Sequence, residues 1–197
     1  MSLAELLDLP GVVEEVVLAG PIGLLAFHGG LEGGTEVVAR RAAAAAGASL
    51  YTVVQPPSVR WHLPSHLVGV APTPALQAFL SHVDTAIAVH GYGRPDRPRD
   101  LLIGGGNRTL GGSLAASLRR HLPGWNILDD LDDLPIAMRG LHPTNPVNLC
   151  HHGGVQLELP PAVRGASGRW IDANLDCRPE LGLVQALAEV AGAQPTS

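Results

Sequence analysis

The chain has 197 residues, of which 46% are hydrophobic and 16% charged, so it is long and apolar enough to bury a core rather than stay disordered. Its formal net charge of −5 argues against a general nucleic-acid binder, and all thirteen basic residues are arginine, which excludes lysine Schiff-base chemistry and a P-loop lysine. Two cysteines exclude a disulfide framework, and the lack of a basic leader or of an apolar run near ~20 residues predicts a cytoplasmic protein without a membrane span.

Short apolar segments alternate with helical patterns along the chain. Runs with the apolar character of strands occupy residues 16–19, 22–27, 50–54, 85–89, 101–103, 125–128 and 155–159. Helical patterns occupy residues 35–46, 74–83, 110–122 and 179–190. Thr35 is a candidate N-cap and Gly47 a candidate C-cap of the first helix. This alternation predicts an α/β fold, a three-layer α/β/α sandwich around a mixed, mostly parallel sheet. We expect a single catalytic domain over residues 1–197, with its core at about 14–192 and a flexible end at 193–197.

The segment from Ala26 to Glu36 carries the first candidate metal ligands. An apolar run leads into His28 and a glycine-rich turn, and the carboxylates of Glu32 and Glu36 follow. A histidine and a nearby glutamate at a strand end can supply two of the three protein ligands of a catalytic zinc. Glu36 fits the first turn of the following helix, where a negative charge is stabilised. Glu32 is therefore the preferred ligand and Glu36 the alternative.

His90 and Glu158 are the candidates for the remaining parts of such a site. His90 follows an apolar run and precedes a glycine, as His28 does, so two central strands could each end in a ligand. The alternative is a histidine that only caps a core strand. Glu158 shares one face of its strand with Gln156, and a carboxylate there is costly to bury unless a metal or a proton transfer requires it. An ion pair with Arg164 is the alternative role for Glu158.

Six segments together resemble a known family. The stretches FHGGLEGGTE, RWHLPSH, AVHGYG, LLIGGGN, HPTNPVN and GGVQLEL, in this order and approximate spacing, are similar to the phage-type poly-γ-glutamate hydrolases. That family is related in fold to the zinc carboxypeptidases, which have a phosphorylase/hydrolase-like fold. The resemblance runs from about residue 28 to 164 and implies one zinc held by His28, Glu32 and His90, with Glu158 as general base.

The chain departs from the family pattern at two points. Glu32 follows His28 at a spacing of four positions, one fewer than in the family motif, whereas zinc carboxypeptidases use a spacing of three. Asn107 stands where the family is expected to have an acidic residue. The first departure concerns the metal ligands themselves, so it also leaves open a protein that keeps the fold but not the zinc.

Arginines in several loops provide candidate substrate-binding groups. Arg94, Arg97 and Arg99 follow His90, and Arg108 follows the glycine-rich turn at 104–106, which we expect at the carboxyl ends of the strands together with His28 and His90. If these loops rim one face, they form a cationic mouth for a polycarboxylate, because arginine binds carboxylates with two parallel hydrogen bonds. The alternative is ordinary loop charge paired with nearby aspartates. The substrate-binding candidates are Arg94, Asn107, Arg108 and His62.

Other histidines are weaker candidates. His62 and His66 flank Pro64 in a loop that could approach the site, where His62 could hydrogen-bond the substrate. His151 and His152 have the composition of a metal-binding tract, but adjacent residues on an extended chain point apart. We therefore expect this pair to face solvent.

The main hypothesis is a zinc-dependent hydrolase of amide bonds, and the family resemblance implies γ-linked polyglutamate or a related compound as substrate. One alternative is a deacylase of N-acyl amino acids, similar to N-formylglutamate amidohydrolases. The alternative from another class is a non-catalytic binding module. The expected partner is a small molecule or a polyanionic peptide, with neither nucleic acid nor membrane involved, and the sequence leaves the oligomeric state open.

Overall fold

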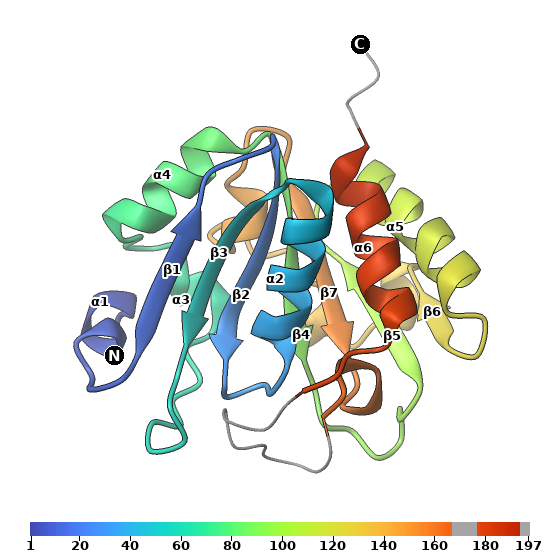
Figure 1. Ribbon diagram of the computed structural model, residues 1–197, viewed down its shortest axis with the longest axis horizontal. Helices are drawn as coiled ribbons and strands as arrows, with labels where there is room; N and C mark the ends of the chain where they lie inside the picture. Colours follow the sequence, from blue (N-terminus) through green and yellow to red (C-terminus); the bar gives the residue numbers. More distant parts are fainter. Residues whose placement is uncertain (167–176, 194–197) are drawn as a thin grey trace.

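The computed structural model describes residues 1–166 and 177–193. Within these residues, seven strands form one sheet in the spatial order β1-β3-β2-β4-β7-β5-β6 (Figure 1). The strands are β1 (Val13–Val17), β2 (Ile22–Gly29), β3 (Ser49–Val54), β4 (Thr85–Gly91), β5 (Asp100–Gly104), β6 (Asn126–Leu128) and β7 (Gly154–Leu159). The α-helices are α1 (Leu3–Leu7), α2 (Thr35–Ala46), α3 (Ser65–Val68), α4 (Pro74–His82), α5 (Arg108–His121) and α6 (Leu181–Gly192). Short 3-10 helices are η1 (Leu131–Asp133), η2 (Ile136–Met138), η3 (Pro146–Asn148) and η4 (Ala162–Arg164).

The sheet is mixed and mostly parallel, as predicted. Strand β2 pairs in parallel with both β3 and β4, β4 pairs in parallel with β7, and β5 with β6. Only the β1–β3 and β5–β7 pairs are antiparallel among the described strands. The carboxyl ends of β2, β4 and β7 therefore meet at one edge of the sheet, which is where ligands bind in this class of fold.

The direction of β5 corrects one expectation. In the antiparallel β5–β7 pair, Leu102 lies opposite Glu158 and Gly104 opposite Gln156. Because β5 runs against β4 and β7, the turn at 104–106 emerges at the edge opposite to the ends of β2 and β4. Our expectation that this turn lies beside His28 and His90 was wrong, since strand direction depends on long-range pairing that an apolar run does not encode.

Helices cover both faces of the sheet and confirm the three-layer architecture. On one face, Leu24 of β2 belongs to a buried cluster with side chains of α2, α5 and α6, including Val38 and Leu118. Figure 1 shows α2 and α6 passing in front of the sheet. On the other face, Phe27 packs in a second cluster with side chains of α1 and α4, including Leu6 and Phe79. The apolar runs of β2 and β4 are thus buried on both sides, as expected for central parallel strands.

The helix ends agree with the sequence signals, with one correction. Gly47 ends α2 in the left-handed conformation at φ 64°, as predicted for a C-cap. Thr35 was predicted to cap the start of α2, but it is the first helical residue and Gly34 holds the cap position at φ 87°. A side chain at Gly34 would meet the backbone oxygen of Arg164 at 2.7 Å, so the chain enters α2 through a position that suits only glycine.

The N-terminal segment contributes to the core, although the predicted core began only at about residue 14. Helix α1 begins at a capping box, in which Ser2 and Glu5 exchange hydrogen bonds. Leu3 and Leu6 of this helix are buried beneath the sheet, N-terminal to the start of the predicted core at residue 14. Of the predicted flexible end at 193–197, all but Ala193 lies outside the described residues.

None of the helices in residues 1–166 and 177–193 is both long enough and apolar enough to cross a bilayer.

Candidate active site

Three strand ends bring the predicted chemistry to one edge of the sheet. In β2 the register shifts between Ala26 and Gly29, a bulge that turns His28 toward the face that also carries Phe27. The ring centroids of His28 and His90 are 5.1 Å apart as a result. On the neighbouring strands, His90 of β4 lies opposite Glu158 of β7. The alternation predicted for β7 also holds, because Gln156 and Glu158 share this face.

A tight turn places Glu32 against the two imidazoles. The Glu32 N–H donates to the His28 carbonyl at 2.8 Å, which closes a turn over the four-residue spacing. Gly30 holds φ 74° in this turn, where a side chain would meet the Gln55 backbone oxygen at 2.1 Å. The turn brings Glu32 Oε1 to 2.8 Å from His28 Nδ1 and Glu32 Oε2 to 3.6 Å from His90 Nδ1.

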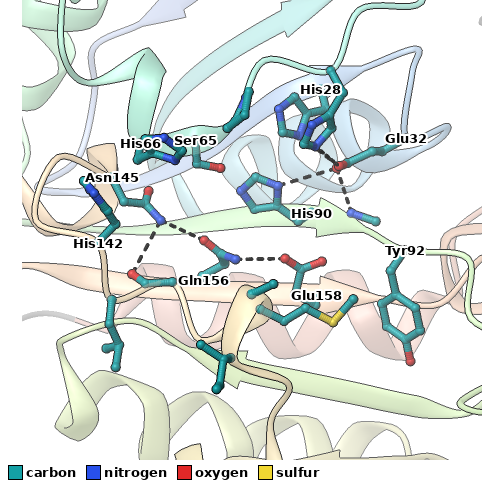
Figure 2. A pocket seen from close by; sticks show the side chains of 18 residues that line it. His28, Glu32, Ser65, His66, His90, Tyr92, His142, Asn145, Gln156 and Glu158 are labelled. Atoms are coloured by element: carbon teal, nitrogen blue, oxygen red, sulfur yellow. Dashed lines mark hydrogen bonds and ion pairs between the residues drawn. The ribbon is translucent and has the colours of Figure 1, made fainter.

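His28, Glu32 and His90 together form a cluster that fits a metal ion. Each offers one ligand atom, and these atoms lie within 4.8 Å of one another. Two imidazoles and a carboxylate are a donor set that zinc prefers. Figure 2 shows the three side chains converging, His28 and Glu32 from the end of β2 and the turn after it, and His90 from β4.

The surroundings of the two histidines support this interpretation. His28 Nε2 lies 2.8 Å from the Leu63 carbonyl, and because a carbonyl can only accept, this nitrogen carries a proton. Metal-binding histidines commonly donate their outer N–H to a carbonyl in this way, which leaves the other nitrogen free for the metal. His90 Nε2 is buried and has no hydrogen-bond partner in the described structure. An unpaired buried nitrogen is costly, so this histidine has a reason other than core packing to be here.

The electrostatics of the cluster favour a bound cation. Burial alone would raise the pKa of Glu32, but the charges and hydrogen bonds of His28 and His90 outweigh it and hold the pKa well below its usual range. Burial alone would lower the pKa of His28, but the charge and hydrogen bond of Glu32, together with the Leu63 carbonyl and the Glu158 charge, outweigh burial and raise it. The Gly91 N–H adds a hydrogen bond of 2.8 Å to Glu32 Oε2. Glu32 is therefore a fixed carboxylate, ready to neutralise a positive charge.

Glu36, the alternative ligand, has another environment. Its side chain lies in the first turn of α2, is buried, and accepts a hydrogen bond of 3.2 Å from the Gly30 N–H. The structure thus brings Glu32 rather than Glu36 to the imidazoles. The identity of the ligand in the metal-bound protein stays a prediction.

Glu158 lies next to the cluster at the end of a chain of hydrogen bonds. Gln156 Nε2 donates to Glu158 Oε1 at 2.8 Å, and Asn145 Nδ2 donates to Gln156 Oε1 at 2.8 Å. All three side chains are buried (Figure 2). Burial, and then the Glu32 charge, raise the pKa of Glu158. A buried carboxylate with a raised pKa and a fixed orientation has the properties of a general base.

Arg164 does not take the role considered for it beside Glu158. Its buried guanidinium donates to the backbone carbonyls of Glu32, Gly33, Leu159 and Tyr92. Arg164 therefore ties the turn after β2 to the ends of β4 and β7, and stabilises the loop that carries Glu32.

A pocket of about 420 Å³ opens over the cluster and Glu158. One part of its wall comes from α3 and the segment before it, with His62 and His66, and another part from the loop at 136–142. His66 and His142 contact each other with ring centroids 4.7 Å apart, so these two parts of the wall meet there. His142, Tyr92 and the apolar side chains of the 136–142 loop were not identified from the sequence. The segment HPTNPVN, which begins at His142, was the sequence signal that could have pointed to this loop.

The predicted substrate-binding residues divide into two groups. His62 lines the pocket, with Nε2 at 3.9 Å from Glu32 Oε1. Arg94 is half exposed, pairs with Asp96 at 3.5 Å and does not line the pocket. Asn107 and Arg108 lie at the opposite edge of the sheet, because they follow β5, which runs antiparallel to β7.

Asn107 and Arg108 have structural contacts at that edge. Asn107 caps α5, accepting a hydrogen bond of 2.9 Å from the Leu110 N–H. Arg108 donates to the backbone carbonyls of Ile103, Gly105 and Asp129. Among the described residues that line the pocket there is no arginine, so the expected cationic mouth is not found there.

The chain is similar to known proteins in both sequence and structure. A family model described as poly-gamma-glutamate hydrolase matches residues 10–169. The structure is similar to that of a bacteriophage poly-gamma-glutamate hydrolase, with 27% sequence identity, coverage of 95% of this chain and 92% of that chain, and a TM-score of 0.77. It is also similar to the zinc-free form of YNDL, with 25% identity, coverage of 91% and 86%, and a TM-score of 0.69.

A more distant similarity concerns the fold alone. A proposed carboxypeptidase from Burkholderia mallei has 11% identity, coverage of 96% of this chain and 64% of that chain, and a TM-score of 0.50. This similarity confirms the carboxypeptidase-like fold predicted from the sequence. No curated protein matches the sequence of the chain.

Proposed function

The chain belongs to the poly-gamma-glutamate hydrolase family, and we propose that it is a zinc-dependent hydrolase that cleaves γ-glutamyl amide bonds. The observation that carries the proposal is the cluster of His28, Glu32 and His90, whose ligand atoms lie within 4.8 Å of one another beside Glu158. This arrangement combines a candidate metal site with a separate buried base, as a hydrolase requires and a simple binding module does not.

His28, Glu32 and His90 would hold the zinc, and the Leu63 carbonyl would keep the His28 ring in the orientation that the metal needs. Zinc bound there would polarise the scissile carbonyl and lower the pKa of water from ~15.7 toward ~7.

Glu158 would take the proton of the attacking water and pass it to the nitrogen of the leaving amine. Its raised pKa makes it a better proton acceptor than an ordinary glutamate. The Gln156 amide holds one oxygen, Oε1, so the second oxygen is left to face the substrate. Burial of Glu158 also limits exchange of the transferred proton with bulk water.

The walls of the pocket are expected to recognise the acidic substrate through histidine rather than arginine. His62, His66 and His142 line the pocket outside the metal cluster. Imidazole can donate a hydrogen bond to a carboxylate. The apolar part of the 136–142 loop would pack against the methylene groups of a glutamyl side chain.

We propose the cytoplasm as the location of the protein, as expected from the sequence.

The direct test compares two substrates on the zinc-loaded protein. We expect it to hydrolyse a γ-linked glutamate oligomer and to leave an α-linked oligomer of the same length intact, as measured by the release of free amines. Preferential hydrolysis of an N-acyl glutamate would favour the deacylase alternative. Stoichiometric zinc without turnover of any of these compounds would favour the binding module.

A further inference from the structure

A second group of metal-ligating side chains lies at the edge of the sheet opposite to the pocket. Asp84 directly precedes β4, and His151 and His152 lie in the turn that leads into β7. Ala86 pairs with Gly154, so the starts of these two strands lie side by side. The His152 N–H donates to the Asp84 carbonyl at 2.8 Å, which ties the two segments together.

The side chains of this group converge, contrary to our expectation for adjacent histidines. His151 Nδ1 lies 3.2 Å from His152 Nε2, and the two ring centroids are 4.4 Å apart in an edge-to-face arrangement. The reason is that the backbone turns here instead of running straight: the Gly153 N–H donates to the Cys150 carbonyl, and Gly153 has φ 63°. The rule that neighbours point apart holds only for an extended strand.

The geometry suits a tetrahedral metal ion. Asp84, His151 and His152 each offer one ligand atom, and these three atoms lie within 4.8 Å of one another. Zinc binds imidazole nitrogen at about 2.0–2.1 Å, so two nitrogens on one tetrahedral zinc are about 3.4 Å apart. The observed 3.2 Å between the two imidazole nitrogens is close to that value.

We propose that Asp84, His151 and His152 form a second metal site for zinc or a similar divalent transition metal. Two imidazoles and one carboxylate favour such ions over magnesium and calcium, which prefer oxygen ligands. All three side chains are exposed, so an ion reaches them directly and water completes its coordination. This proposal is independent of the function proposed above.

The site would act as a clip between β4 and β7. These strands carry His90 and Glu158 at their far ends, and Thr85 already donates a side-chain hydrogen bond to the Gly153 carbonyl between the same two segments. A metal bound by Asp84 and the two histidines would add a second link there. The clip would therefore stabilise the folded chain, since an ion that binds only the folded state raises its stability.

The test measures zinc per chain after dialysis against buffered micromolar zinc. We expect the double variant His151→Ala/His152→Ala to bind one equivalent less than the wild type. His121→Ala is the matched control, because His121 pairs with the single carboxylate of Glu189 and has no second imidazole there; it should bind as much zinc as the wild type. Equal zinc in the double variant and the wild type would overturn the proposal and leave the two imidazoles simply hydrogen-bonded.

A second measurement separates this site from the pocket. In zinc titrations followed by NMR, the ring signals of His151 and His152 should shift in the wild type and also in a His28→Ala variant, while that of His121 should not. Titration without any shift of the His151 and His152 signals would contradict the proposal, whatever the activity of the enzyme.

Discussion

The two edges of the sheet carry the same types of ligand in opposite settings. At the carboxyl ends of β2 and β4, His28 and His90 are 1% and 3% exposed, and Glu32 is fixed between them. At the starts of β4 and β7, Asp84, His151 and His152 are exposed. The buried candidate ligands have fixed partners and lie beside the buried carboxylate of Glu158, whereas the role proposed for the exposed group is only to bind an ion. Burial and hydrogen bonding, more than residue type, therefore separate a site suited to catalysis from one suited to binding.

The largest effect is expected from replacing Glu32, whose carboxylate lies between the two buried imidazoles. Glu32→Gln should lose its zinc and its turnover, because it removes the negative charge that neutralises the metal. Glu36→Gln is the matched control; its amide oxygen can still accept from the Gly30 N–H, so zinc and activity should stay. Zinc analysis and hydrolysis of the γ-linked oligomer check both. Zinc lost from Glu36→Gln but kept by Glu32→Gln would reverse the ligand assignment.

A smaller loss is expected from Gln156→Leu. It removes the hydrogen bond to Glu158 Oε1, and a hydrogen bond to a charged group contributes ~1.5–3 kcal/mol, so kcat should fall roughly 10- to 100-fold while zinc stays bound. Gln77→Leu on the exposed face of α4 is the control and should have no effect. An unchanged kcat in Gln156→Leu would mean that Glu158 does not need this partner.

The pH dependence of activity should shift in a defined direction when the hydrogen bond from Gln156 to Glu158 is removed. A base must be deprotonated, so activity should fall as the pH drops through the pKa of Glu158, and burial raises that pKa above the usual value for glutamate. The Gln156 hydrogen bond lowers the pKa again in part. The acid limb of kcat/KM in Gln156→Leu should therefore move to higher pH than in the wild type. A shift to lower pH would contradict the assignment.

At the opposite edge, Arg108→Ala should affect stability and not activity. Its guanidinium satisfies the Ile103, Gly105 and Asp129 carbonyls, so its loss should lower the free energy of unfolding by about 1–3 kcal/mol. Urea unfolding measures this change. A large rise in KM with unchanged stability would show instead that Arg108 binds substrate.

The smallest effect is expected from Arg94→Ala. Arg94 is half exposed, and its ion pair with Asp96 at 3.5 Å should contribute no more than about 1 kcal/mol. Unfolding and kinetics should both resemble the wild type. A clear rise in KM for the γ-linked oligomer would restore Arg94 as a substrate-binding residue.

The sequence was informative where local patterns determine structure. The apolar runs that became β2, β4 and β7 located the strands, and parallel strands end at the same edge, so His28, His90 and Glu158 could be expected to converge. The sequence could not give the direction of β5, which depends on antiparallel pairing with β7. Asn107 and Arg108 were therefore expected at the wrong edge.

The sequence did not predict the turns that bring side chains together. It favoured Glu32 over Glu36, but it did not predict the turn closed by the hydrogen bond from the Glu32 N–H to the His28 carbonyl, which brings Glu32 to the imidazoles. The contact between His151 and His152 depends on the turn before β7. The wall at 136–142 has no periodic pattern, because it packs over the pocket without regular strands or long helices.

The proposed mechanism requires Glu158 to act as a base beside a metal that it does not hold. The Glu158→Gln variant tests this directly, by zinc content and by hydrolysis of the γ-linked oligomer in one preparation. We predict that zinc stays at the wild-type level and that kcat falls by ~10²–10⁴-fold, the usual contribution of a general base. Wild-type turnover in the zinc-loaded variant would show that Glu158 is not the general base.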